Sequence, residues 1–261
     1  MARISLEIKG KLGSISLHSL QSTLGNVEHI LAELDRAISR NPNGTLDWKV
    51  IGLSTGSLIV EVASESRVEG ADFGPRVAGT YVRGMQSIEV EGLSPEYLSP
   101  QGMAYAKKLI KTIGHNGAAG LKISTPGQEV ELTAQASVNI DQLLKPGWKS
   151  IGSIEGRLDT ISFHRAKPNF VVYHSITHKA VKCVVNAEML SRGKDLLGRR
   201  VNVFGTVHYN ARGEPVRVEA EGIRSLRSRV ELPTLDDIGG IDPDFTGELT
   251  SEEFLRRMRN G

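Results

Sequence analysis

Residues 148 to 227 contain the pattern that most constrains the fold, because five segments in them alternate apolar and polar side chains. One long strand is predicted by SIGSIEGRLDTISFHR, a hairpin by NFVVYHSI and KAVKCVVN, and two further strands by RRVNVFGTVHYN and EPVRVEAEGIRSL, about a turn at 211–213. Between the third and fourth strands, EMLSRGKDLLG has helical character. Gly156 and Gly205 stand where strongly coiled strands must bend. The segments therefore predict a small curved sheet in the order β-β-β-α-β-β.

This order resembles the OB-fold, a five-stranded β-barrel that often binds single-stranded nucleic acid by stacking bases on aromatic rings while basic groups follow the phosphates. The residue types that the resemblance requires lie in the first long loop, on the second strand and around the turn between the last two strands. The candidate nucleic-acid contacts are Phe163, His164, Arg165, Lys167, Tyr173, Tyr209, Arg212 and Arg217. The alternative is a structural or protein-binding barrel with an ordinary basic surface.

Charge is distributed unevenly along the 261 residues. Residues 1–146 hold 14 lysines and arginines against 15 acidic residues, a net charge of −1. Residues 147–230 hold 15 against 7, or +8, and residues 231–261 hold 3 against 8, or −5. This segregation predicts three units: an α+β domain at 1–146, the OB-like five-stranded barrel at 147–230, and a tail at 231–261 in which an acidic extended segment precedes a short amphipathic helix.

The first unit has mixed periodicity. ISLEIKG predicts a strand, the spacing from Leu24 to Ile38 predicts a helix, and WKVIGLSTGSLIVEVAS predicts two strands about a turn. GMAYAKKLIKTIG predicts a second helix, followed by a strand pair at 120–133. The glycine-rich pieces LSTGS and HNGAAG lack the spacing of a phosphate-binding loop, so they are interpreted as turns. His18, His29 and His115 have no metal-ligand spacing, so no catalytic role is predicted for them.

The segment IDPDFTGELTSEEF in the tail permits two interpretations. In the first, residues 242–253 form a weak EF-hand-like calcium loop, with Asp242, Asp244, Glu248 and Glu253 among its oxygen donors. A threonine at the fifth position and a proline- and glycine-interrupted approach argue against it. In the second, Thr250 and Glu253 form a capping box that starts a helix near Ser251. That helix is too short to be stable alone in water, so it is expected to dock on a partner.

The run LPTLDDIGGIDPDFTGELTSEEFLRRMRNG resembles the toxin-binding tails of bacterial antitoxins, particularly those paired with PIN-domain ribonucleases. The resemblance implies that Arg256, Arg257 or Arg259 forms bidentate bonds with the metal-binding carboxylates of a toxin. It also implies that Phe254, Leu255 and Met258 are the apolar anchors. The chain departs from small antitoxins, which usually join such a tail to a compact DNA-binding domain. A third interpretation lays the acidic tail across the basic barrel, where it competes with nucleic acid.

Several classes of protein are disfavoured. A single cysteine, Cys183, excludes an internal disulfide framework and a multi-cysteine zinc site. Without a long apolar run or a signal peptide, the sequence predicts a cytoplasmic protein with no membrane contact. No nucleophile elbow, paired carboxylates or nucleotide loop is evident, so a non-enzymatic binding protein without a cofactor is predicted. Its main predicted function is antitoxin-like neutralisation of a protein partner through the tail. The alternative is a single-stranded nucleic-acid-binding OB protein with an autoinhibitory acidic tail.

Overall fold

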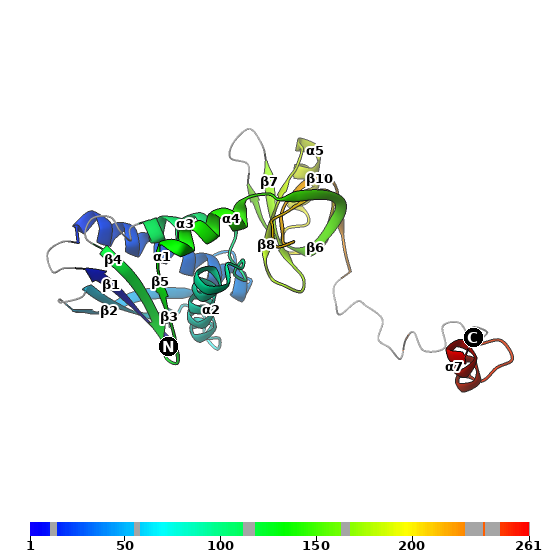
Figure 1. Cartoon of the computed structure of the whole chain (residues 1–261), viewed down its shortest axis with the longest axis horizontal. Coiled ribbons are helices and arrows are strands. Elements are labelled where there is room, and N and C mark those ends of the chain that lie inside the picture. Colours follow the sequence, from blue (N-terminus) through cyan, green and yellow to red (C-terminus); the bar gives the residue numbers. More distant parts are fainter. Residues whose placement is uncertain are drawn as a thin grey trace. The chain divides into compact units, whose positions relative to one another are not determined.

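The chain forms two five-stranded sheets, one open and one closed into a ring (Figure 1). The computed structural model describes residues 1–10, 15–54, 58–111, 118–162, 168–227, 237 and 246–260. These residues divide into two compact units, Met1–Leu226 and Arg227–Gly261. Both sheets belong to the first unit.

The open sheet is antiparallel and has the strand order β2-β3-β1-β4-β5. Its strands are β1 (Arg3–Gly10), β2 (Leu46–Ser54), β3 (Leu58–Ser66), β4 (Ala118–Thr125) and β5 (Gln128–Leu132). Alternate residues of the central strand β1, such as Leu6, are buried while Glu7 between them is not. One face of the sheet is therefore core.

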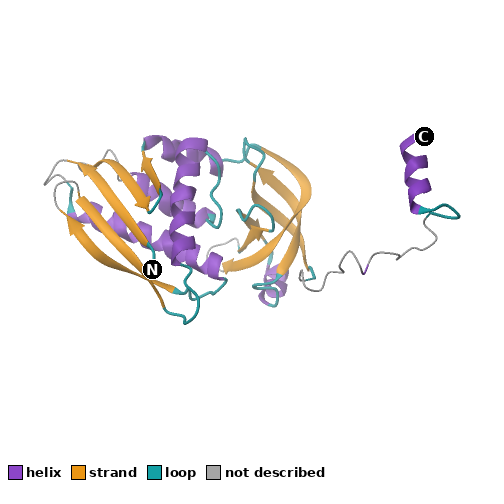
Figure 2. Ribbon diagram, turned by 90° about the horizontal axis from the view of Figure 1, so that it is seen from below, coloured by secondary structure: helices purple, strands orange, loops and turns teal. Residues whose placement is uncertain are grey.

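Helices cover that face, and Figure 2 shows them on one side of the open sheet. They are α1 (Leu17–Ser39), α2 (Gly74–Gln86) with the π-helical turn η1 (Ser87–Glu91), α3 (Pro100–Lys111) and α4 (Ala134–Leu144). The helix predicted from Leu24 starts earlier, at Leu17, because the side chain of Ser16 accepts a hydrogen bond from the Ser19 backbone and caps it. The arrangement agrees with the predicted α+β pattern.

The closed sheet consists of β6 (Trp148–Ser162), β7 (Asn169–His174), β8 (Ala180–Val184), β9 (Arg200–Tyr209) and β10 (Pro215–Ser225), with α5 (Ala187–Lys194) between β8 and β9. Its order is β10-β8-β7-β6-β9, and β10 also pairs with β9, which closes the ring. Within it, β8 and β10 are parallel neighbours and the other pairs are antiparallel. The predicted order β-β-β-α-β-β is confirmed. The inside is filled by valines together with Phe170, Leu158 and Cys183.

Gly156 and Gly205, where the sequence predicts that the strands bend, are sites of close backbone approach. A Cβ atom on Gly156 would clash with the carbonyl oxygen of Tyr173, and one on Gly205 would clash with that of Glu219. Gly205 also has a φ of 154°, which side chains rarely adopt. Both positions therefore require glycine for the strands to curve past each other.

The second unit contains α7 (Ser251–Asn260), which starts at the predicted residue. The predicted domain boundaries near 146 and 230 stay predictions. Within the described residues, no helix is both long and apolar enough to cross a membrane.

Candidate nucleic-acid interface

Four cationic or imidazole side chains form a row across the outside of the closed sheet, which we call the cross-strand row. Its members, each paired with the next across neighbouring strands, are Lys149 on β6, His208 on β9, Arg217 on β10 and Lys182 on β8. The adjacent Val207, Val218 and Cys183 are fully buried inside the ring. Since side chains alternate along a strand, the four members of the row point outward.

The charge of the row is only partly compensated. Glu219, one step further along β10, lies 3.0 Å from Nη2 of Arg217 and 3.4 Å from Nε2 of His208. Nε of Arg217 is buried without a hydrogen-bond partner among the described residues. Lys149 and Lys182 have no ion pair in the part of the chain that the structure describes. The row therefore presents a net positive strip that can hold phosphate groups.

Apolar side chains lie on the same outward face. Ile151 lies two residues after Lys149 on β6, and Phe204 lies four residues before His208 on β9. An even separation along a strand puts two side chains on the same face, so both point outward like the members of the row. Ile151 is 76% exposed and Phe204 is 45% exposed. Trp148 and Tyr209, at the end of the same two strands, have the opposite parity, and Tyr209 packs against the core inside the closed sheet. Their rings stack with centroids 4.1 Å apart and an angle of 12° between the planes. An exposed ring such as that of Phe204 beside a cationic strip is the combination that single-stranded nucleic acid requires.

The structure separates the predicted nucleic-acid contacts. Arg217 belongs to the cross-strand row, whereas Tyr209 has the parity of the buried Val207, packs against the core of the closed sheet and stacks on Trp148. Arg212 is exposed in the turn between β9 and β10, with its guanidinium next to Gly92, which directly follows η1. The loop residues Phe163, His164, Arg165 and Lys167 lie outside the described residues. No role in nucleic-acid contact was predicted from the sequence for Lys149, Lys182 and Phe204. Their positions between the apolar residues of alternating strands indicate that they point outward, so the sequence contained the signal needed to find them.

Tyr173 is buried against Tyr97, so the structure does not present it for ligand contact. Its hydroxyl donates to the carbonyl oxygen of Tyr97 at 3.2 Å, and burial raises the pKa of Tyr173. The backbone N–H of Tyr97 donates to the carbonyl oxygen of His178 at 2.9 Å, and the two rings stack with centroids 4.9 Å apart. Tyr97 and His178 both have positive φ values, 57° and 53°. Side chains rarely tolerate this conformation, so the surrounding packing must hold the contact in place.

A second contact fixes the turn between β9 and β10. Glu214 accepts hydrogen bonds from the Ser94 hydroxyl at 2.8 Å and from Nδ2 of Asn210 at 2.9 Å, and it forms an ion pair with Lys179. Burial acts to raise the pKa of Glu214, but these donors outweigh it and lower the pKa. Asn210 also donates to the carbonyl oxygen of Leu143, at 3.4 Å. This turn is therefore anchored to the segment between η1 and α3 and to the end of α4.

In the second unit, α7 has the predicted capping box. The backbone N–H and the hydroxyl of Thr250 donate to Glu253 at 2.9 and 2.8 Å, and the Glu253 backbone N–H donates to the Thr250 hydroxyl at 3.3 Å. The hydrogen bonds from Thr250 lower the pKa of Glu253. Arg256 pairs with Glu252 at 3.5 Å.

Within α7, Leu255 and Met258 are 61% and 71% exposed, while Phe254 is half-buried. Arg257 and Arg259 are exposed. These residues remain candidates for contact with a partner.

The calcium interpretation stays a prediction. Asp242 and Asp244 lie outside the described residues, and the Glu253 carboxylate is engaged in the cap. Across the described ranges, no group of three or more histidine, cysteine, aspartate or glutamate side chains is arranged to hold a metal ion. Cys183 is fully buried in the core of the closed sheet, and this burial raises the pKa of its thiol to about 12.

No protein-family model matches the chain, and no curated protein matches it. Among solved structures, a chain of the Stn1–Ten1 complex of S. pombe is similar over 41% of this chain and 70% of its own length. The two chains are 18% identical, with a TM-score of 0.25. The resemblance of the tail to antitoxins therefore rests on the sequence alone.

Proposed function

We propose that this chain is a non-enzymatic OB-type protein that binds single-stranded nucleic acid on the outside of its closed sheet. The observation that carries the proposal is the cross-strand row beside exposed Phe204 and Ile151. The ring topology supports the OB assignment: the third and fifth strands are parallel neighbours, and a helix joins the third strand to the fourth.

The proposed interface is displaced from the usual one. OB-folds bind ligands on the face of strands two and three and on the loops between strands one and two and strands four and five. Here Tyr97 covers the Tyr173 end of that face, and Glu214 ties the last loop to Ser94. Nucleic acid would therefore cross β8, β10, β9 and β6. Bases stack on Phe204, and the lysines of the row neutralise phosphates. In this proposal the acidic tail competes for the same strip and lowers the affinity.

The test is fluorescence anisotropy with labelled single strands of about 12 nucleotides, a length within the range of OB-fold site sizes. Phe204→Ser removes a stacking ring, and we expect it to weaken binding about tenfold. The double variant Lys149→Gln, Lys182→Gln should weaken binding and reduce the salt dependence, because fewer counterions are released. Lys49→Gln, on the open sheet and exposed, is the matched control.

Two outcomes count against the proposal. One is that neither DNA nor RNA single strands bind at low salt, with or without the tail. The other is that Lys49→Gln weakens binding as much as the two row substitutions do, which would indicate a diffuse charge effect rather than a site.

A second candidate function rests on α7, which presents Leu255 and Met258 to solvent in a unit of its own. In this proposal the tail docks on a protein and, following its resemblance to antitoxin tails, neutralises a PIN-type ribonuclease. The test is co-purification from native cells with the full chain and with residues 1–230. Recovery of a ribonuclease that only the full chain binds and inhibits would support it. Loss of that inhibition in Arg256→Gln, Arg257→Gln or Arg259→Gln would identify the blocking arginine.

A further inference from the structure

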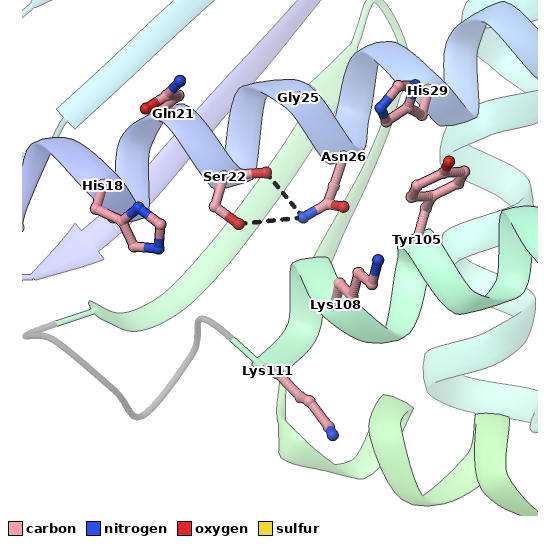
Figure 3. Close-up of a pocket in the computed structure, with 9 residues that line it drawn as sticks. All are labelled: His18, Gln21, Ser22, Gly25, Asn26, His29, Tyr105, Lys108 and Lys111. Atoms are coloured by element: carbon pink, nitrogen blue, oxygen red, sulfur yellow. Dashed lines mark hydrogen bonds between the residues drawn. The ribbon is translucent and has the colours of Figure 1, made fainter.

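An open groove lies between α1 and α3, as Figure 3 shows. One wall comes from α1, where Ser22, Gly25, Asn26 and His29 follow one helical stripe. The other wall comes from α3, with Tyr105, Lys108 and Lys111. The groove has a volume of about 590 Å³, which is within the range of small-molecule sites. It lies on different elements from the cross-strand row and plays no part in the function proposed above.

The lining is basic and includes no aspartate or glutamate. Lys108 and Lys111 are three residues apart on α3, so their side chains share a face of the helix. Both are exposed. Their neighbour Lys107 is bound to Asp141 of α4, so it does not contribute to the groove. His18, one helical turn before Ser22 on α1, also lines the groove. An anion in this groove would meet two lysines from α3 and polar groups from α1 without a competing carboxylate in the lining.

Aromatic contacts hold one end of the groove in place. The rings of His29 and Tyr105 stack with centroids 4.5 Å apart, which links α1 to α3. Nζ of Lys108 lies 5.4 Å from the centre of the Tyr105 ring, so a cation–π contact positions the ammonium group. The positive charge at this end is therefore partly preorganised.

The floor of the groove offers a hydroxyl donor. The buried Asn26 donates from Nδ2 to the carbonyl oxygen of Ser22 at 2.8 Å and to its hydroxyl oxygen at 3.4 Å. Because the Ser22 hydroxyl accepts from Asn26, its own hydrogen is free to point elsewhere. A phosphate oxygen is a suitable acceptor for it.

Gly25 adds an independent observation. It stands in the middle of a 23-residue helix, where glycine is less favourable than alanine. A Cβ atom built on it would meet nothing within 4 Å among the described residues. In contrast, a Cβ on Gly102 of α3 would clash with Leu98, so packing accounts for that glycine. Packing among the described residues therefore does not require a glycine at position 25, and the open space beside it leaves the helix backbone accessible to a ligand.

We propose that this groove binds a phosphate group, with Lys108 and Lys111 as its cations, Ser22 as a hydrogen-bond donor and Gly25 as the open floor. Phosphate is favoured because strong acceptor oxygens with a concentrated negative charge match lysine ammonium groups and a hydroxyl. The phosphate belongs either to a small phosphorylated molecule or to the end of a nucleic-acid strand. The experiment separates these two sources.

The test follows the backbone amide resonances of the full chain by NMR during titration with inorganic phosphate, pyrophosphate, and matched oligonucleotides with a 5′-phosphate or a 5′-hydroxyl end. We expect saturable shifts at Ser22, Gly25 and Asn26. Lys108→Gln should weaken the binding about tenfold. Gly25→Ala should weaken it too while raising Tm, because alanine favours the helix. Lys145→Gln, an exposed lysine outside the groove, is the control and should change nothing.

Shifts with inorganic phosphate or pyrophosphate identify the free phosphate group as sufficient. Shifts that require the 5′-phosphorylated strand identify the strand end as the source. The proposal is overturned if none of the four ligands moves these amides up to about 10 mM, a very weak affinity, or if Lys108→Gln binds as the wild type does. Phe204→Ser should leave phosphate binding intact, so failure here is distinguishable from failure of the nucleic-acid interface.

Discussion

Two partly buried glutamates, Glu33 and Glu214, have pKa values that are shifted in opposite directions. Burial raises the pKa of Glu33, although the Ser99 backbone donates to its carboxylate. At Glu214 burial acts in the same direction, but the donors Lys179, Asn210 and Ser94 prevail and the pKa is lowered. The two glutamates therefore contribute to stability with opposite pH dependence. The hydrogen-bond donors around Glu214 outweigh the cost of burying its charge, and those around Glu33 do not.

Glu214→Gln should destabilise the first unit by about 2 kcal/mol at pH 7, because it leaves Lys179 without its counter-ion. The folded-state pKa of Glu214 is below the unfolded value, so its stabilising contribution is present above pH 4.5 and is lost as the pH falls through the folded-state pKa. Urea unfolding at a series of pH values should show a flatter acid limb for the variant. Glu129→Gln, which removes the exposed partner of Lys122, should cost less than about 1 kcal/mol.

Glu33→Gln should have the opposite effect and raise the free energy of unfolding at pH 7. The folded-state pKa of Glu33 is above the unfolded value, so its contribution is favourable below pH 4.5 and is lost as the pH rises through the folded-state pKa. The amide keeps an acceptor for the Ser99 backbone without a buried charge. Urea unfolding at pH 7 and pH 4 measures the difference, and the gain should disappear at the lower pH. Destabilisation at both pH values would show that the amide does not fit the packing around Ser99.

For single residues, the sequence identifies side chains of a suitable type for a nucleic-acid interface, but it does not show whether each of them is exposed or covered. Arg217 is at the proposed interface because strand alternation locates it on the outer face, whereas Tyr209 has the parity of the buried residues of β9 and packs against the core. Tyr173 has the same aromatic character but is covered by Tyr97, which is 76 residues away in the sequence. No local pattern reports such a contact. The groove was missed for the same reason, since it joins two helices that are distant in the sequence.

At the scale of the elements, strands were more predictable than helices. The alternation in residues 148–227 predicted all five strands of the closed sheet, because a sheet with one buried face imposes a period of two. Helix α2 was missed because GPRVAGTYVRGMQ contains three glycines and several residues that favour strands. Burial of Val77, Tyr81 and Met85 against the core overrides these local preferences. Tertiary contacts therefore determine this element.

The curvature of the closed sheet is testable at Gly205. Gly205→Ala should destabilise the first unit by about 3 kcal/mol, because the new Cβ would clash with the Glu219 carbonyl and strain the backbone. Gly222→Ala on the paired strand β10 is the control, since its Cβ would meet nothing within 4 Å. Thermal and urea unfolding should separate the two variants clearly. Equal stability of Gly205→Ala and the wild type would contradict the close approach of β9 and β10.

Helix α7 depends on its cap. Thr250→Ala removes the hydroxyl that binds Glu253, and we expect it to destabilise the helix by about 1 kcal/mol. Hydrogen exchange of the backbone amides at Glu253 and Phe254 in the full chain should become faster. Thr250→Ser keeps the hydroxyl and should retain the wild-type rate. If both variants exchange at the wild-type rate, the capping box does not contribute to the helix.

At the scale of the whole molecule, charge and contacts divide the chain differently. The sequence predicts a boundary near residue 146 from the change in net charge, yet Tyr97 and Ser94 on one side bind His178 and Glu214 on the other. The turns that contain His178 and Glu214 are therefore bound to residues before position 146, and Arg227–Gly261 form a compact unit of their own. The acidic tail is the one charged segment that truncation can remove without cutting through either sheet.

Removal of the tail should consequently strengthen nucleic-acid binding if the tail competes for the cross-strand row. The tail has a net charge of −5 and residues 147–230 have +8, so their attraction is strongest at low salt. We expect residues 1–230 to bind a single strand about tenfold more tightly than the full chain at low salt, with a smaller difference as salt is raised. Anisotropy titrations of both forms at several salt concentrations measure this. Equal affinities at every concentration would separate the tail from the closed sheet and favour its use as a docking segment for another protein.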